Sequence, residues 1–525
     1  MDIDVLQRFS MKVLEISALL FVFLLGVGVL LLVYLYLADV TQSQQAIRKN
    51  YPIVGRFRYF FEHMGEFFRQ YFFAQDREEL PFNRAQRSWA YRAAKDVDST
   101  VAFGSTRALN QPGDILYLNG LFPTLSEDAL SPEPLTIGAG HAAKPYTTAS
   151  LVNISGMSYG ALSTPAVRAL SAGAAKAGIW MNTGEGGLSA HHLEGGCDIV
   201  FQIGTAKYGV RTPEGDLSDD KLRDIAEHTQ VRMFEIKMSQ GAKPGKGGIL
   251  PGAKVTEEIA EIRGIAAGSD SISPNGHTDI RSIDELLDKI LHIRTVTGKP
   301  TGFKSVIGES AWLDEMCQAI HRRGLQYAPD FMTIDSADGG TGAAPQSLID
   351  YMGLPIKRSL PLVVDKLIEY QLKDRIKVMT SGKLINPADV AWALSIGADF
   401  VTSARGFMFA LGCIQALQCN KNTCPTGITT HDIALQRGLD PTDKSERVAN
   451  FAKNLAYEVG VIAHSCGVEQ ARGLSRKHAQ IINAQGIPEP LEHVFPLPAP
   501  RPEYEKIPTV QVSNSHSMPE QESPP

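Results

Sequence analysis

Three of the six cysteines lie in one short segment, GCIQALQCNKNTCPTG, as Cys413, Cys419 and Cys424. Their spacing is Cys-x5-Cys-x4-Cys, and Pro425 directly follows the last thiol. Such thiolates are typical ligands of an iron–sulfur cluster, because a compact loop can point several sulfur atoms inward while its backbone N–H groups stabilise the cluster's charge. No fourth cysteine lies nearby in the sequence, so the segment predicts a three-iron (3Fe-4S) cluster.

Two other interpretations of this cysteine segment stay open. Zinc usually takes four ligands, and His431 could add a fourth to the three thiolates. The thiols could also be buried together by coincidence. The remaining cysteines, Cys197, Cys317 and Cys466, have no such spacing and are expected to be ordinary core thiols. Six cysteines in 525 residues are too few for a disulfide-built secreted scaffold, which favours a reducing compartment.

The segments that must position such a loop have the pattern of parallel βα units. Short β-branched runs alternate with helical patterns such as Thr164–Ala177 and Pro387–Ser395. The eight candidate strands are 149–155, 179–184, 198–204, 233–238, 302–308, 331–336, 377–382 and 400–405. This number predicts an α/β fold, a closed (β/α)8 TIM barrel with its chemistry at the C-terminal strand ends. A doubly wound sheet is the alternative, because strand number alone does not show closure.

Motifs at these strand ends resemble the synthase domain of the FMN-binding glutamate synthase family. LGCIQALQCNKNTCPTGITT is similar to that family's three-iron, four-sulfur cluster loop. The likeness covers roughly residues 145–440, and the upstream YPIVGRFRYFFE and LPFNR segments resemble short, single-chain bacterial glutamate synthase-like proteins. The other matching segments, in family order, are GMSYGALS (156–163), NTGEGG (182–187), EIKMSQGAKPGKGGILPG (235–252), SISPNGHTDIRSIDEL (271–286) and DGGTGAAP (338–345).

The resemblance implies FMN at the barrel mouth. In barrels a cofactor phosphate usually lies at the turns after strands 7 and 8, which here are Ser381–Gly382–Lys383 and Ser403–Ala404–Arg405–Gly406. Their small residues let backbone N–H groups approach, while Lys383 or Arg405 adds positive charge. The family has an extra glycine and an arginine where this chain has Ser381 and Lys383, so individual phosphate contacts should differ. The glycines could instead only tighten the turns.

The family's matching positions also imply which residues surround the flavin ring. Lys304 is the candidate that stabilises negative charge near flavin N1, because a fixed cation favours reduction. The alternative role of such a lysine is that of a salt-bridge partner. Gly339 and Gly340, in the DGGTGA loop, bring flexible backbone close to the cofactor. The other expected ring neighbours are Met157, Ser158, Tyr159, Gln202 and Lys237.

For the substrate, the resemblance implies 2-oxoglutarate held over the flavin by Glu185, Lys237, Gln240 and Lys243. A dicarboxylate requires cations or amides at each end, and the imine formed with ammonia must lie within hydride distance of flavin N5. The catalytic candidates are therefore Lys237, Gln240 and Glu185, with Glu185 in proton transfer. A surface ion pair is the alternative for Glu185 and Lys243.

The predicted activity is reductive amination of 2-oxoglutarate to glutamate by an oxidoreductase of the CH–NH2 class. We expect no glutaminase domain, so ammonia would be taken directly, come from a separate glutaminase subunit, or be replaced by another amine as in N-methylglutamate synthases. Ferredoxin or a reductase subunit is the expected electron donor, since no G-x-G-x-x-G fingerprint lies in a βαβ unit. A non-catalytic membrane-bound flavin and iron–sulfur electron relay stays open as another function.

An apolar N-terminal segment predicts a membrane anchor. Residues Ile16–Ala38 carry no charge, and a helix of that length, rising about 1.5 Å per residue, crosses a hydrocarbon core of roughly 30 Å. A cleaved signal peptide is the alternative, but its apolar region would be shorter. Basic residues that follow the segment predict a single-pass protein of the cell membrane with a cytoplasmic catalytic part. These residues are Arg48, Lys49, Arg56 and Arg58.

The whole chain divides into five predicted parts. These are a transmembrane anchor (1–45), an aromatic-rich extension (46–144), the barrel with its cysteine loop (145–440), a helical extension (441–495) and a disordered Pro-rich tail (496–525). Within the extension, residues 51–73 suit either a helix at the membrane surface or a buried helical hairpin. The net charge of −6 argues against a nucleic-acid partner.

Overall fold

The structure is a computed structural model that describes residues 3–504. By its internal contacts the chain divides into two compact units, Met1–Ala85 and Gln86–Pro525. The first unit contains helices α1 (Ile3–Thr41), α2 (Ala46–Asn50) and α3 (Val54–Phe68), and a π-helical turn at Arg69–Phe73. The second unit contains the barrel, residues 86–144 of the extension before it and the extension after it.

Helix α1 extends the predicted apolar span at both ends. Its residues Gln7–Thr41 are long and apolar enough to cross a membrane, and their most apolar 18-residue window has a mean hydropathy of 3.0. Helix α3 then runs on into the π-helical turn as one continuous element, so the predicted alternative of a helical hairpin is wrong for residues 51–73.

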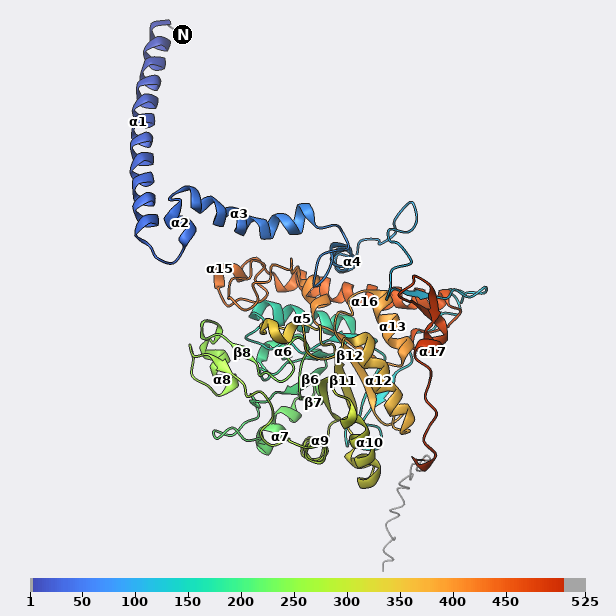
Figure 1. Ribbon diagram of the computed structural model, residues 1–525. Coiled ribbons are helices and arrows are strands. Elements are labelled where there is room, and N and C mark those ends of the chain that lie inside the picture. The colour runs from blue at the N-terminus through green and yellow to red at the C-terminus, as the bar shows by residue number, and fades with distance from the viewer. Residues whose placement is uncertain (1–2, 505–525) are drawn as a thin grey trace, which may run out of the picture. The chain divides into compact units, whose positions relative to one another are not determined.

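Eight parallel strands close into a barrel, which confirms the predicted (β/α)8 fold and excludes the doubly wound sheet (Figure 1). Closure is made by the first and last strands, which pair through Val401 and Val152. The strand β6 is buried at every position, as expected for a strand covered on both faces. The barrel strands are β4 (Val152–Ile154), β5 (Met181–Asn182), β6 (Ile199–Ile203), β7 (Val231–Lys237), β10 (Thr301–Val306), β11 (Phe331–Asp335), β12 (Lys377–Ser381) and β13 (Phe400–Ser403).

Helices with strong end signals connect the strands. Ser163 caps α5 by accepting from the Ala166 N–H, and Gly178 ends that helix in the left-handed conformation. The predicted helix 164–177 is confirmed, and the second predicted helix ends one residue later, at Ile396. The larger helices of the second unit are α4 (Arg84–Ala94), α5 (Thr164–Ala177), α7 (Asp219–Glu227), α9 (Ile283–Thr297), α10 (Ala311–Arg323), α12 (Ile356–Glu369), α13 (Pro387–Ile396), α14 (Arg405–Leu411) and α16 (Pro441–Ser465).

Residues 86–144 and the extension after the barrel pack on the barrel. Helix α16 lies on α5 so closely that a Cβ on Gly173 would meet Val448 at 2.5 Å. The strand β1 (Ile115–Tyr117) pairs with β14 (Ala479–Ile482), which also pairs with β15 (Pro488–Pro490). The hairpin β2–β3 (Leu135–Ile137 and Tyr146–Thr148) adds Ile137 and Tyr146 to the core inside the barrel. The remaining short elements are α6 (Ala190–Glu194), β8 (Ile249–Leu250), α8 (Glu257–Arg263), β9 (Ser271–Ile272), α11 (Gln346–Ile349), α15 (Ile433–Gln436) and α17 (Leu491–Val494).

The predicted disorder of the Pro-rich tail is wrong for its first part, residues 496–504. Residues up to 504 contact the barrel helices, because Arg501 pairs with Glu369 at 2.6 Å and the Tyr504 ring stacks on His321 with centroids 4.3 Å apart. These two contacts offset the ordering entropy that the Pro-rich composition alone would not. The rest of the predicted tail, 505–525, lies outside the described residues.

Candidate active site at the barrel mouth

The three catalytic candidates form one hydrogen-bonded chain at the C-terminal ends of the strands. Glu185 follows β5, Lys237 is the last residue of β7, and Gln240 lies on the loop after it. The Glu185 Oε1 atom is 2.8 Å from Lys237 Nζ, which also donates to Gln240 Oε1. Gln240 Nε2 donates to Thr341 Oγ1 at 3.1 Å, which extends the chain to the DGGTGA loop.

This chain is buried, so the alternative of a surface ion pair is wrong. The side chains of Glu185 and Lys237 are 15% and 11% exposed. Burial raises the pKa of Glu185, but the positive charges of Lys237 and Lys243 lower it more, so the pKa lies below its usual value. Burial lowers the pKa of Lys243, and the Glu185 charge opposes that shift. Glu185 is therefore a carboxylate at neutral pH, able to accept a proton.

A buried carboxylate organises the barrel mouth beneath this chain. Glu235 Oε1 accepts from Asn182 Nδ2 at 2.9 Å and from Gln202 Nε2 at 2.7 Å. Its Oε2 accepts from the Thr333 hydroxyl at 2.5 Å. The Gln202 Nε2 atom donates to Glu235, so the amide oxygen of Gln202 points away from that carboxylate. Sequence reasoning missed Glu235, although a glutamate within the apolar strand MFEIK was a signal.

Lys304 forms a buried ion pair beside this network. Its Nζ lies 3.0 Å from Asp335 Oδ2, and the two side chains are 7% and 5% exposed. Burial lowers the pKa of Lys304, but Asp335 and Glu235 raise it more, so the pKa lies above its usual value. The lysine is therefore a fixed cation, and it is also the salt-bridge partner named in the alternative. Lys304, Glu235, Asn182 and Thr333 all line one small cavity inside the barrel.

The two turns predicted to bind phosphate lie beside the DGGTGA loop. Lys383 Nζ is 2.8 Å from Asp338 Oδ2, and Arg405 Nη2 donates to the Asp338 carbonyl at 3.2 Å. Burial lowers the pKa of Arg405 to about 10, so it stays charged at neutral pH. Gly382 has a φ of 115°, and a Cβ there would meet the Ser336 Cβ at 2.1 Å. The glycine is thus required by close packing, whatever the loop binds.

The predicted ring neighbours after β4 lie against the NTGEGG loop. A Cβ on Gly184 would meet the backbone N of Ser158 at 2.4 Å and the carbonyl carbon of Met157 at 2.7 Å. Tyr159 is buried, and its hydroxyl donates to Glu258 Oε2 at 2.6 Å. The Tyr159 hydroxyl therefore contacts helix α8, while the backbones of Met157 and Ser158 adjoin the Glu185 loop. Gly339 and Gly340 also pack closely: Gly339 lies against the backbone of Gly241, and Gly340 lies against the side chain of Arg405.

The cysteine loop begins where helix α14 ends. The Gln415 N–H donates to Cys413 Sγ at 3.4 Å, and Tyr91 donates to the Cys413 carbonyl at 2.6 Å. Cys424 Sγ lies 3.4 Å from Thr426 Oγ1. Burial raises the pKa of Cys413 to about 12. Burial also raises the pKa of Cys424, but hydrogen bonds from Thr426 and neighbouring groups lower it below its usual value.

A buried lysine lies against this loop. Lys254 is 1% exposed, and its Nζ donates to the carbonyl oxygens of Cys419 at 3.1 Å and Ala161 at 3.2 Å. A cation at this position fits a negatively charged group in the loop, as an iron–sulfur cluster with thiolate ligands would be. Sequence reasoning missed Lys254, which lies far from the cysteines along the chain.

The ligand geometry of a single metal ion is not present among residues 3–504: no three His, Cys, Asp or Glu side chains converge there. His431, the fourth ligand of the zinc alternative, has its Nε2 2.9 Å from the Gly160 carbonyl. The six cysteines are all free. Cys197 and Cys317 are buried core thiols as predicted, and Cys466 is partly buried.

The conserved region of glutamate synthase matches residues 124–469. The chain belongs to the glutamate synthase family. It is 37% identical to the glutamate synthase large subunit-like protein YerD of Bacillus subtilis, over 89% of this chain and 96% of that protein. It is 34% identical to the archaeal-type glutamate synthase (NADPH) of Thermotoga sp. strain RQ2, over 64% of this chain and 63% of that protein. The predicted family is confirmed, and the chain spans less than two thirds of the Thermotoga protein.

Solved structures similar to this glutamate synthase family member share little sequence with it. A mandelate oxidase mutant with an FMN adduct has a TM-score of 0.42 and 15% identity, over 71% of this chain and 94% of that chain. Flavocytochrome b2 with pyruvate bound has a TM-score of 0.43 and 13% identity, over 79% and 89%.

Proposed function

We propose that this protein is a membrane-bound FMN and iron–sulfur oxidoreductase that reductively aminates 2-oxoglutarate. The observation that carries the proposal is the buried chain Glu185–Lys237–Gln240 at the mouth of the barrel. An ionised acid, a cation and an amide so placed match the needs of a dicarboxylic oxo acid and an amine. Membership of the glutamate synthase family supports the reaction class.

The residues present fit FMN. Lys383 and Arg405 supply cations at the two turns where a barrel usually binds a cofactor phosphate. Lys304 supplies a fixed positive charge at the small cavity, where it would stabilise a reduced flavin ring. A bound flavin would supply the hydride equivalent for the reduction.

The substrate roles follow from the charges. Lys237, with Gln240, would bind one carboxylate of the oxo acid, and Lys243 is the cation available for the other. Glu185, held as a carboxylate, would take a proton from an incoming ammonium ion at its Oε atoms and return it to the departing oxygen. Ammonia itself, a separate glutaminase subunit or another amine could supply the nitrogen.

The cysteine loop would hold a three-iron cluster through Cys413, Cys419 and Cys424. The buried Lys254 beside the loop supports this assignment, because it provides positive charge where thiolate ligands would bring negative charge. The cluster would pass electrons from ferredoxin or a reductase subunit.

The first experiment tests the amination. The full-length protein, purified in detergent and reduced without oxygen, should be reoxidised at its flavin absorbance by 2-oxoglutarate plus ammonium and far less by either alone. Lys237→Met should abolish this reoxidation while FMN stays bound, whereas Lys221→Met, on helix α7, should not affect it. If Lys237→Met reoxidises normally, or if only artificial acceptors work, the protein is an electron relay. Methylamine in place of ammonium tests the N-methylglutamate alternative.

The membrane location is tested separately. The apolar helix α1 and the basic residues after it support a single-pass protein of the cell membrane with a cytoplasmic barrel. Deletion of residues 1–73, which removes α1, α3 and the turn after it, should move the protein to the soluble fraction with its flavin retained. If the truncated protein stays in the membrane fraction, another segment also binds lipid.

A further inference from the structure

The segment after the apolar helix α1 is connected to it by a buried carboxylate. Asp39, the first charged residue after the span, is 0% exposed. Its Oδ1 atom lies 2.6 Å from Arg48 Nη2 and 2.8 Å from Arg56 Nη2. Its Oδ2 accepts from the Ile53 N–H, directly before α3, at 3.0 Å. These contacts hold the first turn of α3 beside the C-terminal end of α1.

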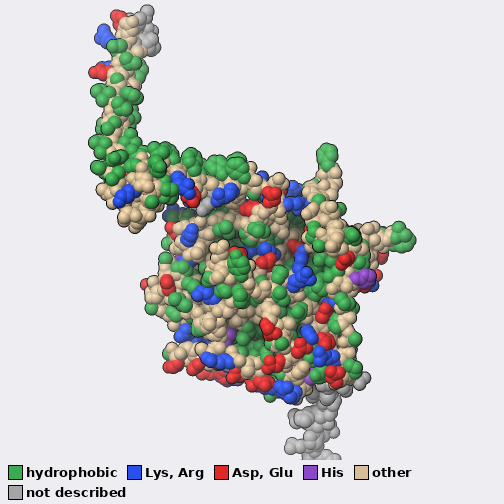
Figure 2. All heavy atoms as spheres, viewed as in Figure 1, with side chains coloured by type: hydrophobic (Ala, Val, Ile, Leu, Met, Phe, Trp, Pro, Cys, Tyr) green, Lys and Arg blue, Asp and Glu red, His purple; other side chains and the backbone are tan. Residues whose placement is uncertain are grey.

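Helix α3 has one continuous apolar face. Six of its apolar residues, at 54, 57, 60, 61, 64 and 68, lie within about 120° of one another around a helix. Phe57, Phe60 and Phe61 are 55%, 55% and 64% exposed, so no part of the described chain covers them. Figure 2 shows hydrophobic side chains gathered along one side of α3, with Lys and Arg on the other.

We propose that α3 lies flat in the surface of the same phospholipid bilayer that α1 crosses, with its phenylalanine face among the acyl chains. This inference rests on the proposed span of α1. The depth of the helix follows from Asp39: α1 has no charge from Ile16 to Ala38, so Asp39 lies where the hydrocarbon ends. A helix that starts there with an unburied aromatic face matches an interfacial helix.

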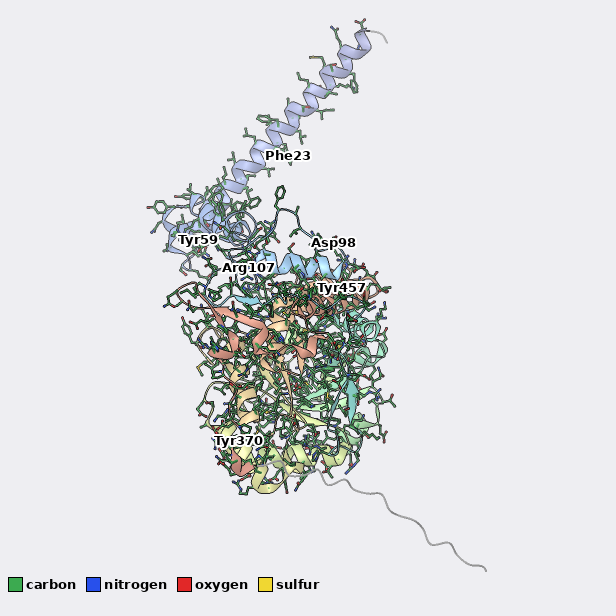
Figure 3. The ribbon with its side chains drawn as sticks, turned by 90° about the vertical axis from the view of Figure 1, so that its right-hand side faces the viewer. Phe23, Tyr59, Asp98, Arg107, Tyr370 and Tyr457 are labelled. Carbon is green, nitrogen blue, oxygen red and sulfur yellow. The ribbon has the colours of Figure 1, made fainter. Side chains whose placement is uncertain are left out.

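Charge agrees with this placement. Arg56, Arg58 and Arg69 flank the apolar face, and guanidinium groups at this depth attract anionic lipid phosphates. Arg56 is also one of the two arginines that bind Asp39, so its side chain connects the two helices and borders the lipid surface. Figure 3 labels Phe23 on α1 and Tyr59 on α3, and both helices belong to the unit Met1–Ala85.

The test places a photoreactive benzoylphenylalanine at single positions of the full-length protein in phosphatidylcholine and phosphatidylglycerol nanodiscs. Phe61 reports the apolar face, and its neighbour Glu62, which is also exposed, reports the opposite face as the matched control. Leu24, in the middle of α1, reports the span. After illumination, mass spectrometry of the labelled peptides measures the fraction that has gained one phospholipid.

The expected result is a lipid adduct at Leu24 and Phe61, with about tenfold less at Glu62. Adducts at Leu24 with equal labelling at Phe61 and Glu62 would overturn the inference while leaving the span intact. Protein adducts at Phe61 would also overturn it, because that face would then be covered by protein. Absence of lipid at Leu24 would refute the span itself and the inference with it. Asp39→Asn should reduce the adduct at Phe61 and leave that at Leu24 unchanged.

Discussion

Replacing Glu235 by glutamine tests the buried network at the barrel mouth. Glu235 is 2% exposed and accepts three hydrogen bonds, from Asn182, Gln202 and Thr333. Glutamine has almost the same shape but one acceptor oxygen fewer, and its NH2 group would face donors. If its oxygen stays with the two amides, its NH2 faces the Thr333 hydroxyl, which must then turn round to accept.

The size of the effect follows from the number of bonds. A hydrogen bond to a charged group contributes about 1.5–3 kcal/mol, against about 0.5–1.5 kcal/mol for a neutral one. Each of the three bonds therefore loses about 1 kcal/mol, for a total near 3 kcal/mol, or roughly a hundredfold in the unfolding equilibrium. Thr333→Val removes one of the three bonds altogether and should cost about 1.5–3 kcal/mol.

The measurement is urea unfolding of the full-length protein in detergent, followed by circular dichroism and flavin release. Glu227→Gln makes the same chemical change on the exposed end of α7 and should alter the free energy of unfolding by less than about 0.5 kcal/mol. Glu235→Gln should also weaken FMN binding, because the Gln202 amide loses its fixed orientation. If Glu235→Gln unfolds like Glu227→Gln, the three bonds do not stabilise the barrel as argued.

Three other predictions concern separate parts of the second unit. Cys419→Ser should remove the three-iron signal in low-temperature electron paramagnetic resonance while FMN remains, and stoichiometric zinc without iron in the unchanged protein would contradict the cluster. Lys304→Met leaves Asp335 buried without its cation and should lower the free energy of unfolding by about 3–5 kcal/mol, whereas Lys304→Arg should lower it much less. Burial, with a smaller effect of His191, lowers the pKa of His192 to about 3. The folded protein therefore binds no proton there at pH 5, whereas the unfolded imidazole, with a pKa near 6.5, does. Stability should fall by about 2 kcal/mol between pH 7 and pH 5 through this residue, and His192→Gln should lose that part of the pH dependence.

Local patterns in the sequence predicted most of the fold. Buried runs such as IVFQI at β6 need no partner to be recognised as strands, since their composition already requires cover on both faces. Ser163 and Gly178 mark the ends of α5 because each satisfies backbone groups within a few residues. The charge-free segment Ile16–Ala38 was likewise sufficient to predict a long apolar helix.

Contacts between distant residues could not be predicted in this way. The Pro-rich composition of the last residues predicted disorder, yet Arg501 and Tyr504 find partners on α12 and α10. Nothing near Lys254 in the sequence indicates that it contacts the cysteine loop, and nothing near Asp39 indicates which arginines it binds. Each of these partners depends on where another element comes to lie in the fold.

The sequence by itself determined the order of the βα units, the position of the cysteine segment and, through the motifs, the family. Only the tertiary structure decided that Glu185 pairs with Lys237 and that Glu235 holds Gln202. The physical reason is the closure of the barrel. Strand register and tilt bring side chains from non-adjacent segments to one mouth, and only burial among those partners determines which charges and hydrogen bonds they keep.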